Sequence, residues 1–316
     1  MVEVTYQHHF KFGYDYKWFT QRTARSQQWT CQYGVAKDKL SIKEANRQAA
    51  LLIADRASSL NKPIFLMLSG GADSEVAARA FIDAGVPFTA AMLEYRLRAT
   101  PNKIENQFEL DYAKQFVQQY QLPTLVHTMD PEIFWSSAEF DEIAEISRTV
   151  SPQLAATMQF GRYLSRNHNA VVILGQGEPY LYRQFGSWWF REREMIGSWA
   201  RFWRLDNIQG TSGFHQYTPE QMLAYITDPI VIELIESDIA STDQVLNNAI
   251  IKHKLYQYHY PDSNLINRKK YHGFERLFWQ EWTVRDRLRL KYPFSDGVYT
   301  VEYNKMVNCL TGKELW

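Results

Sequence analysis

Six small or polar residues at positions 69–74 have the types and order of a phosphate-binding loop. Two adjacent glycines let the backbone turn tightly and bring its N–H groups close to an anion, where a side chain would collide. An aspartate inside an anion site is repulsive unless a cation lies between them, and Mg²⁺ binds carboxylate and phosphate oxygens together. The same aspartate could instead cap a helix. The run is Ser69, Gly70, Gly71, Ala72, Asp73 and Ser74.

The elements around this run would place it at the end of a strand. Residues 64–68 are continuously apolar, which is typical of a strand buried on both faces. Residues 74–84 favour a helix that stops at Gly85. The first amides of that helix and the positive end of its dipole would face the same anion. The pattern therefore predicts a phosphate site at the carboxyl end of a buried strand.

A regular alternation of strands and helices continues to about residue 175. Strands separated by helical segments imply a parallel sheet, because a parallel connection needs a crossover. The predicted fold class is α/β, an open parallel sheet with helices on both faces, plus a mostly helical C-terminal region. The other expected strands are 88–95, 124–129 and 171–174, and the other expected helices are 41–60, which opens with a Ser41-to-Glu44 capping box, 103–120 and 152–166.

The two ends of the chain have a different character. The N-terminal residues are aromatic and favour strands, so they predict a small hairpin or capping segment. The apolar residues of 176–215 recur with neither a helical nor a strand period. Residues 218–292 favour helices with a polar interruption. We therefore expect an aromatic capping segment at 1–40, a phosphate-binding domain at 41–210 and a helical lid or substrate region at 211–316.

The loop lacks the lysine of the GxxxxGK[ST] phosphate loop and instead matches the pattern SGGxDS. It thereby resembles the N-type ATP pyrophosphatases, the PP-loop superfamily, which includes asparagine, GMP, NAD and argininosuccinate synthetases and several tRNA- and nucleobase-modifying enzymes. The resemblance covers roughly residues 41–180. It implies an adenine nucleotide alpha-hydrolase-like fold of the HUP type, the cofactors ATP and Mg²⁺ with the metal on Asp73, and cleavage of ATP between its α- and β-phosphates.

Cysteine content narrows the branch of that superfamily. Members that transfer sulfur to tRNA generally use catalytic cysteines or an iron–sulfur site, and the 7-cyano-7-deazaguanine synthases carry a four-cysteine zinc site. This chain has two cysteines, Cys31 and Cys309, at opposite ends, where their spacing predicts neither a metal cluster nor a disulfide framework. Oxygen or nitrogen chemistry is therefore favoured, in a reducing compartment.

A second turn, at residues 175–178, resembles the Gly-rich, acid-carrying turn that ends a later strand in asparagine synthetase-like domains. By that resemblance, Gly175 and Gly177 would lie beside the nucleotide, and Glu178 would orient a nucleophile or accept its proton. The turn lacks the Ala-Asp-Glu end of the family's pattern, so a second magnesium carboxylate is missing or comes from elsewhere. The alternative is an ordinary strand-to-loop turn.

A third cluster, at residues 267–276, is basic. Members of the superfamily commonly send a Lys or Arg from the C-terminal region back to the phosphates, where it stabilises the charge that develops on the α-phosphate. Arg268, Lys269 and Lys270 are the candidates, and Lys270 is preferred as the catalytic cation. The alternative is a solvated basic loop ahead of a helix.

Residues 183–204 interleave arginine with tryptophan. Such a surface can stack on bases and hold phosphates, which would make nucleic acid a partner. The alternative is a structural role, as a packed or oligomer-forming helix in which Glu192 and Glu194 pair with the arginines. This second interpretation is favoured.

Composition limits the remaining partners. The 35 basic and 35 acidic residues balance, so nothing global indicates a polyanionic partner. No stretch approaches the roughly 18–20 apolar residues that span a bilayer, and the first residues do not resemble a secretory signal. We therefore expect a cytoplasmic protein with a small-molecule or nucleobase substrate and no membrane partner, either monomeric or a homo-oligomer.

These features combine into one expected mechanism. ATP would bind with its adenine read by backbone groups of Met92, Leu93 and Glu94 at the end of the second strand. A carboxylate or carbonyl oxygen of the substrate would attack the α-phosphorus, and a nitrogen nucleophile would then displace the adenylate. Position 2 is Val, so no N-terminal Cys nucleophile of a glutaminase is expected, and the nitrogen would come from ammonia, a partner or the substrate. The alternatives are a nucleobase- or nucleic-acid-modifying enzyme and a non-catalytic ATP-binding module.

Overall fold

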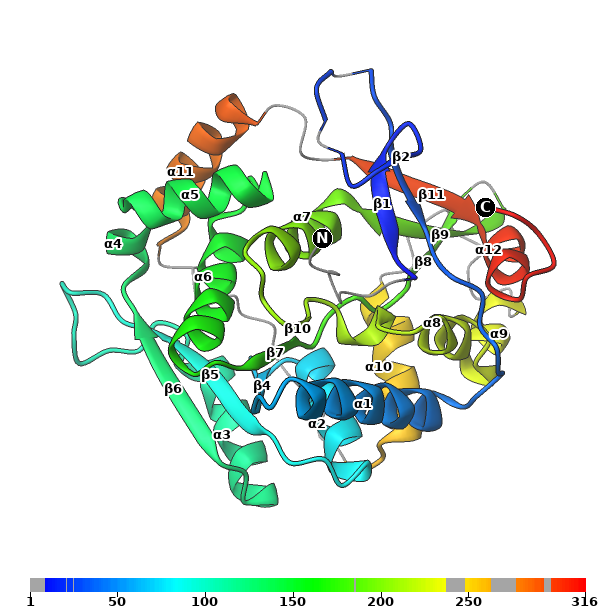
Figure 1. Ribbon diagram of the computed structural model, residues 1–316, viewed down its shortest axis with the longest axis horizontal. Coiled ribbons are helices and arrows are strands. Elements are labelled where there is room, and N and C mark those ends of the chain that lie inside the picture. Colours follow the sequence, from blue (N-terminus) through cyan, green and yellow to red (C-terminus); the bar gives the residue numbers. More distant parts are fainter. Residues whose placement is uncertain are drawn as a thin grey trace.

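A five-stranded parallel sheet is the largest sheet in the part of the chain that the structure describes (Figure 1). The computed structural model describes residues 9–20, 22–24, 26–184, 186–236, 248–262, 277–292 and 297–316. The strands lie in the spatial order β10-β7-β4-β5-β6, and neighbours pair in parallel. Their bounds are β4 Ile64–Met67, β5 Thr89–Tyr95, β6 Thr124–Met129, β7 Val171–Leu174 and β10 Gly210–Thr211.

Helices cover both faces of this sheet, which confirms the predicted α/β class. One face packs against α1 (Ile42–Ser59), α2 (Ala72–Asp83) and α3 (Gln107–Tyr120). The other face is covered by α4 (Pro131–Trp135), α5 (Ala138–Ser147), α6 (Pro152–Asn167), α7 (Glu194–Leu205) and α11 (Phe278–Lys291).

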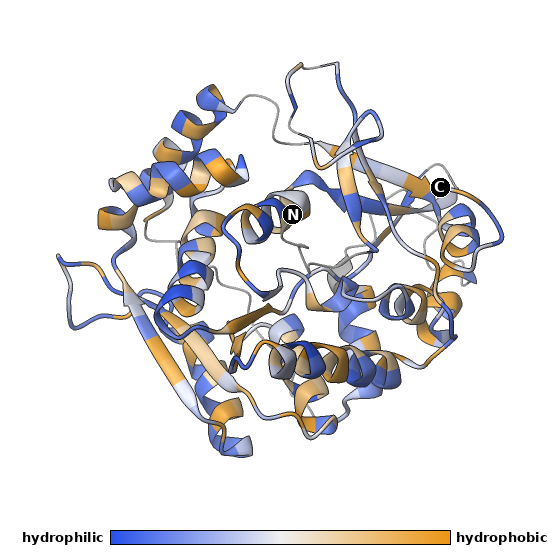
Figure 2. Cartoon of the chain, viewed as in Figure 1, coloured by the Kyte–Doolittle hydropathy of each residue, from blue (hydrophilic) through white to orange (hydrophobic). Residues whose placement is uncertain are grey.

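The central strand β4 shows how the sequence produces these two layers. All four of its residues are buried, and successive side chains of a strand point to opposite faces. Ile64 and Leu66 accordingly belong to the core on the α1–α3 side, whereas Phe65 and Met67 belong to the core on the α6 side. Figure 2 shows hydrophobic colour along the strands of the sheet, while the helices that cover it carry both colours.

Two small antiparallel sheets and several helices share a third core. The first sheet confirms the predicted N-terminal hairpin and adds a third strand to it. The second joins a hairpin to a strand near the C-terminus. The bounds are β1 Lys11–Tyr14, β2 Lys17–Trp18, β3 Trp29–Gln32, β8 Tyr180–Gln184, β9 Ser187–Arg193, β11 Val298–Glu302, α8 Pro219–Ile226, α9 Pro229–Glu236, α10 Asn248–His259 and α12 Tyr303–Leu310, with a 3-10 turn at Phe214–Gln216.

Most of the predicted elements are present, with some differences. Ser41 caps α1 through its hydroxyl, but the Glu44 carboxylate bonds Arg47 rather than completing the capping box. Helices α4 and α5 were not predicted, and residues 183–184 and 187–193 lie in strands rather than in a helix. The boundaries proposed at residues 40 and 210 stay predictions.

Among the residues that the structure describes, no helix combines the length and the apolar character that a membrane span requires.

Candidate active site

The loop at residues 69–74 lies between the end of β4 and the start of α2, as predicted. Gly70 has φ +80°, and a Cβ there would lie 2.0 Å from the backbone oxygen of Glu109 in the first turn of α3. Position 70 therefore requires glycine, because other residues rarely adopt this φ and any Cβ would collide with the Glu109 carbonyl. The loop is therefore pressed against the N-terminal turn of α3.

Serine hydroxyls at the two ends close the loop on itself. Ser69 Oγ lies 3.1 Å from Ser74 Oγ and accepts a hydrogen bond from Gly71 N at 3.3 Å. Ser74 Oγ in turn donates to the carbonyl oxygen of Gly71 at 2.9 Å. These bonds fix the backbone without using the first amides of α2, and no side chain of the described residues caps that helix. The amides of Ala72 and Asp73, which have no intrahelical acceptor, are therefore suited to bind an anion.

The turn after β7 packs directly on this loop. A Cβ at Gly175 would lie 2.6 Å from the Cα atom of Ser74, so the close approach requires glycine. Gly177 has φ +95°, a conformation that also favours glycine. The turn directs the Glu178 side chain toward the loop, where it shares a partner with Asp73.

That shared partner is Lys252 on α10. Its Nζ atom lies 2.8 Å from Asp73 Oδ2 and 3.0 Å from Glu178 Oε1. One turn further along the helix, the Tyr256 hydroxyl donates to Asp73 Oδ1 at 3.1 Å. Residues four apart on a helix lie on one face, so α10 presents a cation and a hydroxyl together to the loop.

The electrostatics of this cluster keep Asp73 and Lys252 charged. Burial alone would raise the pKa of the Asp73 carboxyl, but the positive charge of Lys252 and the neighbouring His215 hold it below its usual range. Burial would lower the pKa of the Lys252 ammonium, yet the two carboxylates raise it well above its ordinary value. The side chain of Asp73 is 24% exposed and that of Lys252 12%, so a ligand can still reach the cluster from solvent.

A segment after β10 holds the loop from its other side. His215 Nε2 lies 2.9 Å from the carbonyl oxygen of Asp73. The same segment is tied to the β7 turn, because His215 N donates to the Gln176 carbonyl at 3.0 Å and the Gln176 amide donates to Ser212 O at 2.7 Å. The phosphate loop, the β7 turn and residues 212–216 therefore form one connected unit.

A buried carboxyl group on β9 interacts with this cluster. Tyr33 donates its hydroxyl proton to Glu192 Oε2 at 2.5 Å, and Arg193 N donates to Oε1 at 2.9 Å. Burial raises the pKa of Glu192 to about 7, although both hydrogen bonds lower it, and the negative charge of Glu178 raises it further. Glu192 therefore gains a proton on folding at pH values between its unfolded and folded pKa.

Replacing Glu192 with glutamine should change the pH dependence of stability. From about pH 4.5 to about 7 the folded protein holds a proton that the unfolded chain has lost, so wild-type stability falls as pH rises through this window. Glu192→Gln has no charge to bury, so its free energy of unfolding should exceed that of the wild type by about 1–3 kcal/mol at pH 8. The two should converge as the pH approaches about 4.5. Urea unfolding across this range measures the difference.

Glu233→Gln, at an exposed position of α9, is the matched control and should follow the wild-type pH profile. Parallel profiles for Glu192→Gln and the wild type would show that Glu192 is ionised in the folded protein.

The residues expected at the adenine lie in the C-terminal half of β5. Met92 is buried, and Leu93 is half-buried. The Leu93 carbonyl accepts a hydrogen bond from the Asn106 side chain at 2.8 Å, and the Glu94 carboxylate binds Arg96. Some of the groups expected to read a base therefore have partners within the protein, and adenine binding at Met92, Leu93 and Glu94 stays a prediction.

Lys252 is a C-terminal cation at the site that the sequence analysis did not name. Lys270, Arg268 and Lys269 lie outside the described residues, so their role stays untested. Among the described residues, Lys252 is a cation from the C-terminal region that contacts both predicted acids. Its only signal in the sequence is a lysine four residues ahead of a tyrosine in a helical segment, which is too common to single it out.

The Arg- and Trp-rich run is largely packed inside the protein. Trp188, Trp199 and Trp203 are buried, so their rings are not free to stack on bases. Glu192 and Glu194 accept hydrogen bonds from Tyr33 and Tyr14, and the charge of Arg201 also acts on Glu194. A packed role is therefore favoured for these rings, while nucleic acid as a partner stays a prediction.

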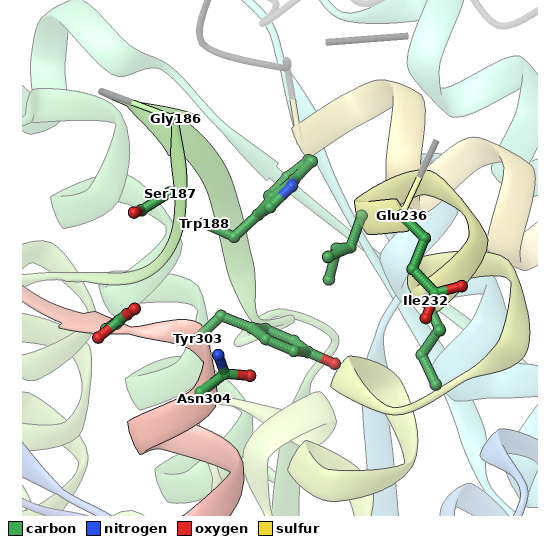
Figure 3. A pocket seen from close by; sticks show the side chains of 9 residues that line it. Gly186, Ser187, Trp188, Ile232, Glu236, Tyr303 and Asn304 are labelled. Atoms are coloured by element: carbon green, nitrogen blue, oxygen red, sulfur yellow. The ribbon is translucent and has the colours of Figure 1, made fainter. Parts of the chain in front are cut away.

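A cavity of about 350 Å³ opens between β9, α9 and the β11–α12 junction. Figure 3 shows Trp188 and Tyr303 pointing into the same space, with Ile232 and Glu236 on the helix across from them. None of the residues that bind Lys252 lines this cavity. It is therefore separate from the phosphate loop.

Comparison with known proteins gives distant similarities. No protein-family model matches the chain, and no curated protein sequence matches it. Among solved structures, NMN synthetase from Francisella tularensis is 15% identical, with 87% of this chain and 94% of that chain covered and a TM-score of 0.40. The NH3-dependent NAD synthetase from Campylobacter jejuni is 13% identical, with 80% and 94% covered and a TM-score of 0.34.

A third similar structure is the glutamine-dependent NAD+ synthetase from Acinetobacter baumannii, which is 14% identical. The similarity covers 88% of this chain and 52% of that chain, with a TM-score of 0.33. With TM-scores below 0.5, these similarities are too distant to indicate what the present chain binds.

Proposed function

We propose that this chain is an ATP-dependent synthetase of the PP-loop type that forms AMP and pyrophosphate. It would adenylate a carboxylate or carbonyl oxygen of its substrate and let a nitrogen nucleophile displace the AMP. One observation carries the proposal: the Lys252 ammonium bridges Asp73 of the phosphate loop and Glu178 of the β7 turn. A cation and two carboxylates thereby meet at the uncapped N-terminus of α2.

The loop itself would bind the leaving pyrophosphate. The amides of Ala72 and Asp73 and the positive end of the α2 dipole favour an anion at this point. Ser69 and Ser74 hold the loop in shape before ATP arrives, so no reorganisation is needed at the moment of reaction. Negative charge developing on the departing phosphates would therefore be stabilised by groups that are already in place.

The carboxylates fit a magnesium site that is completed by ATP. Asp73 and Glu178 converge on a single ammonium, so their oxygens face a common point. The described residues hold no group of three or more metal-ligating side chains, but Mg²⁺ usually takes one or two carboxylates together with phosphate oxygens and water. When bound, Mg²⁺ would neutralise charge on the β- and γ-phosphates.

Lys252 would change partners when ATP binds. Its two acids are the ones proposed to hold the metal, so the ammonium becomes available for the α-phosphate, the point that gains charge during attack. Glu178 has a second proposed role, which is to orient the nitrogen nucleophile or accept its proton. Its position next to the phosphate loop supports both roles.

The experiment that tests this function is an assay of AMP and pyrophosphate release. The purified protein is given ATP, Mg²⁺ and ammonium with a panel of carboxylates, including carboxylates carried on nucleotides. We expect AMP and pyrophosphate in equal amounts with at least one member of the panel. Release of ADP and phosphate would place cleavage at the wrong bond, and no release with any substrate would indicate a non-catalytic ATP-binding module.

A further inference from the structure

Tyr225 on α8 is a buried phenol held in a fixed position. The helix begins with a complete capping box, in which Thr218 and Gln221 bond each other's backbone N–H groups at 3.1 and 3.2 Å. The Gln221 side chain also donates to Asn46 of α1 at 2.9 Å. Tyr225 itself is 4% exposed and packs in the core that α8 shares with the antiparallel sheets. Its hydroxyl therefore has little freedom to move.

That hydroxyl has no hydrogen-bond partner among the described residues. The neighbouring Tyr256, which is equally buried, donates its hydroxyl proton to Asp73. Buried polar side chains are nearly always hydrogen-bonded in native proteins, so an orphaned hydroxyl needs an explanation. A ligand that arrives at the site would supply the missing acceptor.

The charges of the Asp73–Lys252–Glu178 cluster act on this hydroxyl. After burial, the charge of Glu178 acts most strongly on Tyr225, followed by Lys252 and then Asp73. Burial and the carboxylates raise the pKa of Tyr225 far above its usual range, so the phenol stays protonated and can donate. All three charges act on the hydroxyl, and Tyr225 shares one core with Tyr256, whose hydroxyl bonds Asp73, so the Tyr225 hydroxyl lies within electrostatic range of the cluster.

We propose that the Tyr225 hydroxyl donates a hydrogen bond to the carboxylate of the second substrate, beside Glu178, and thereby sets the affinity for that substrate rather than for ATP. The proposal rests on the proposed function. A carboxylate next to Glu178 is repelled unless donors or cations offset the charge. Tyr225 and Lys252 are the donor and the cation that the described residues place there.

Tyr225→Phe tests the proposal. The change removes an unpartnered hydroxyl without opening a cavity, so the melting temperature should be equal to or higher than that of the wild type. The KM of the carboxylate that supports pyrophosphate release should rise roughly 10- to 100-fold. The Kd of α,β-methylene-ATP with Mg²⁺, measured by calorimetry, should stay within about twofold, because the phosphate loop is unchanged.

Tyr303→Phe is the matched control, because its hydroxyl donates to Ile226 O at 2.8 Å on the same helix and lies at the separate cavity. It should leave both constants unchanged. An unaltered carboxylate KM in Tyr225→Phe, or activity only with substrates that lack a carboxylate, overturns this proposal and leaves the proposed function standing. Absence of pyrophosphate release with the whole panel overturns both.

Discussion

Replacing Lys252 with methionine should lower ATP-dependent pyrophosphate release by roughly 10³-fold. Lys252 is the one cation among the described residues that contacts both Asp73 and Glu178, so no neighbour can supply its charge to the α-phosphate. Methionine keeps an unbranched side chain as far as its ε-carbon and removes the ammonium group with its charge and donors. Initial rates of pyrophosphate release at saturating ATP measure the effect, and urea unfolding shows whether the fold survives.

Two further lysine variants interpret that result. Lys254→Met changes an exposed lysine on the same helix and should keep full activity. Lys270→Met tests the cation that the sequence favoured. If Lys270→Met abolishes activity while Lys252→Met does not, then Lys252 has only a structural role and the assignment made here is wrong.

The phosphate loop could be predicted from sequence because its signal is local. The glycines that must turn, the serines that bond each other and the helix that begins at the loop all lie within a few residues. Residues 64–67 are continuously apolar, and this alone indicates a strand between two helical layers. The α/β class follows from the same kind of local pattern repeated along the chain.

Lys252 could not be predicted because its contacts are distant in sequence. It lies 179 residues from Asp73 and 74 residues from Glu178. Three adjacent cations at 268–270 gave a stronger pattern than one lysine in a helix, and these three lie outside the described residues. Glu178 was predicted from the resemblance of its turn to a family pattern. Its position next to Asp73 is a consequence of β4 and β7 being neighbours in the sheet.

Helices α4 and α5 have capping residues that could have been recognised in the sequence. Asp130 caps α4 through its carboxylate, with Pro131 in the first turn, and Ser137 caps α5. Both are ordinary helix starts. The β8–β9 hairpin is harder, because β9 is completed by β11, which begins more than a hundred residues later. Buried and half-buried residues alternate along β9, but this pattern identifies a strand only once its partner β11 is known.

Asp73→Asn should abolish turnover, by roughly 10³-fold or more, while leaving the fold intact. Asparagine has the same size and can still accept the Tyr256 hydroxyl, but it removes the charge that binds Lys252 and that would hold Mg²⁺. Pyrophosphate release measures the loss, and a cooperative unfolding transition shows that the protein is folded. Asp83→Asn, at the exposed end of the same helix, should behave as the wild type. Near-normal activity in Asp73→Asn would exclude this carboxylate from the chemistry, because no conservative change to a metal-binding acid is expected to be silent.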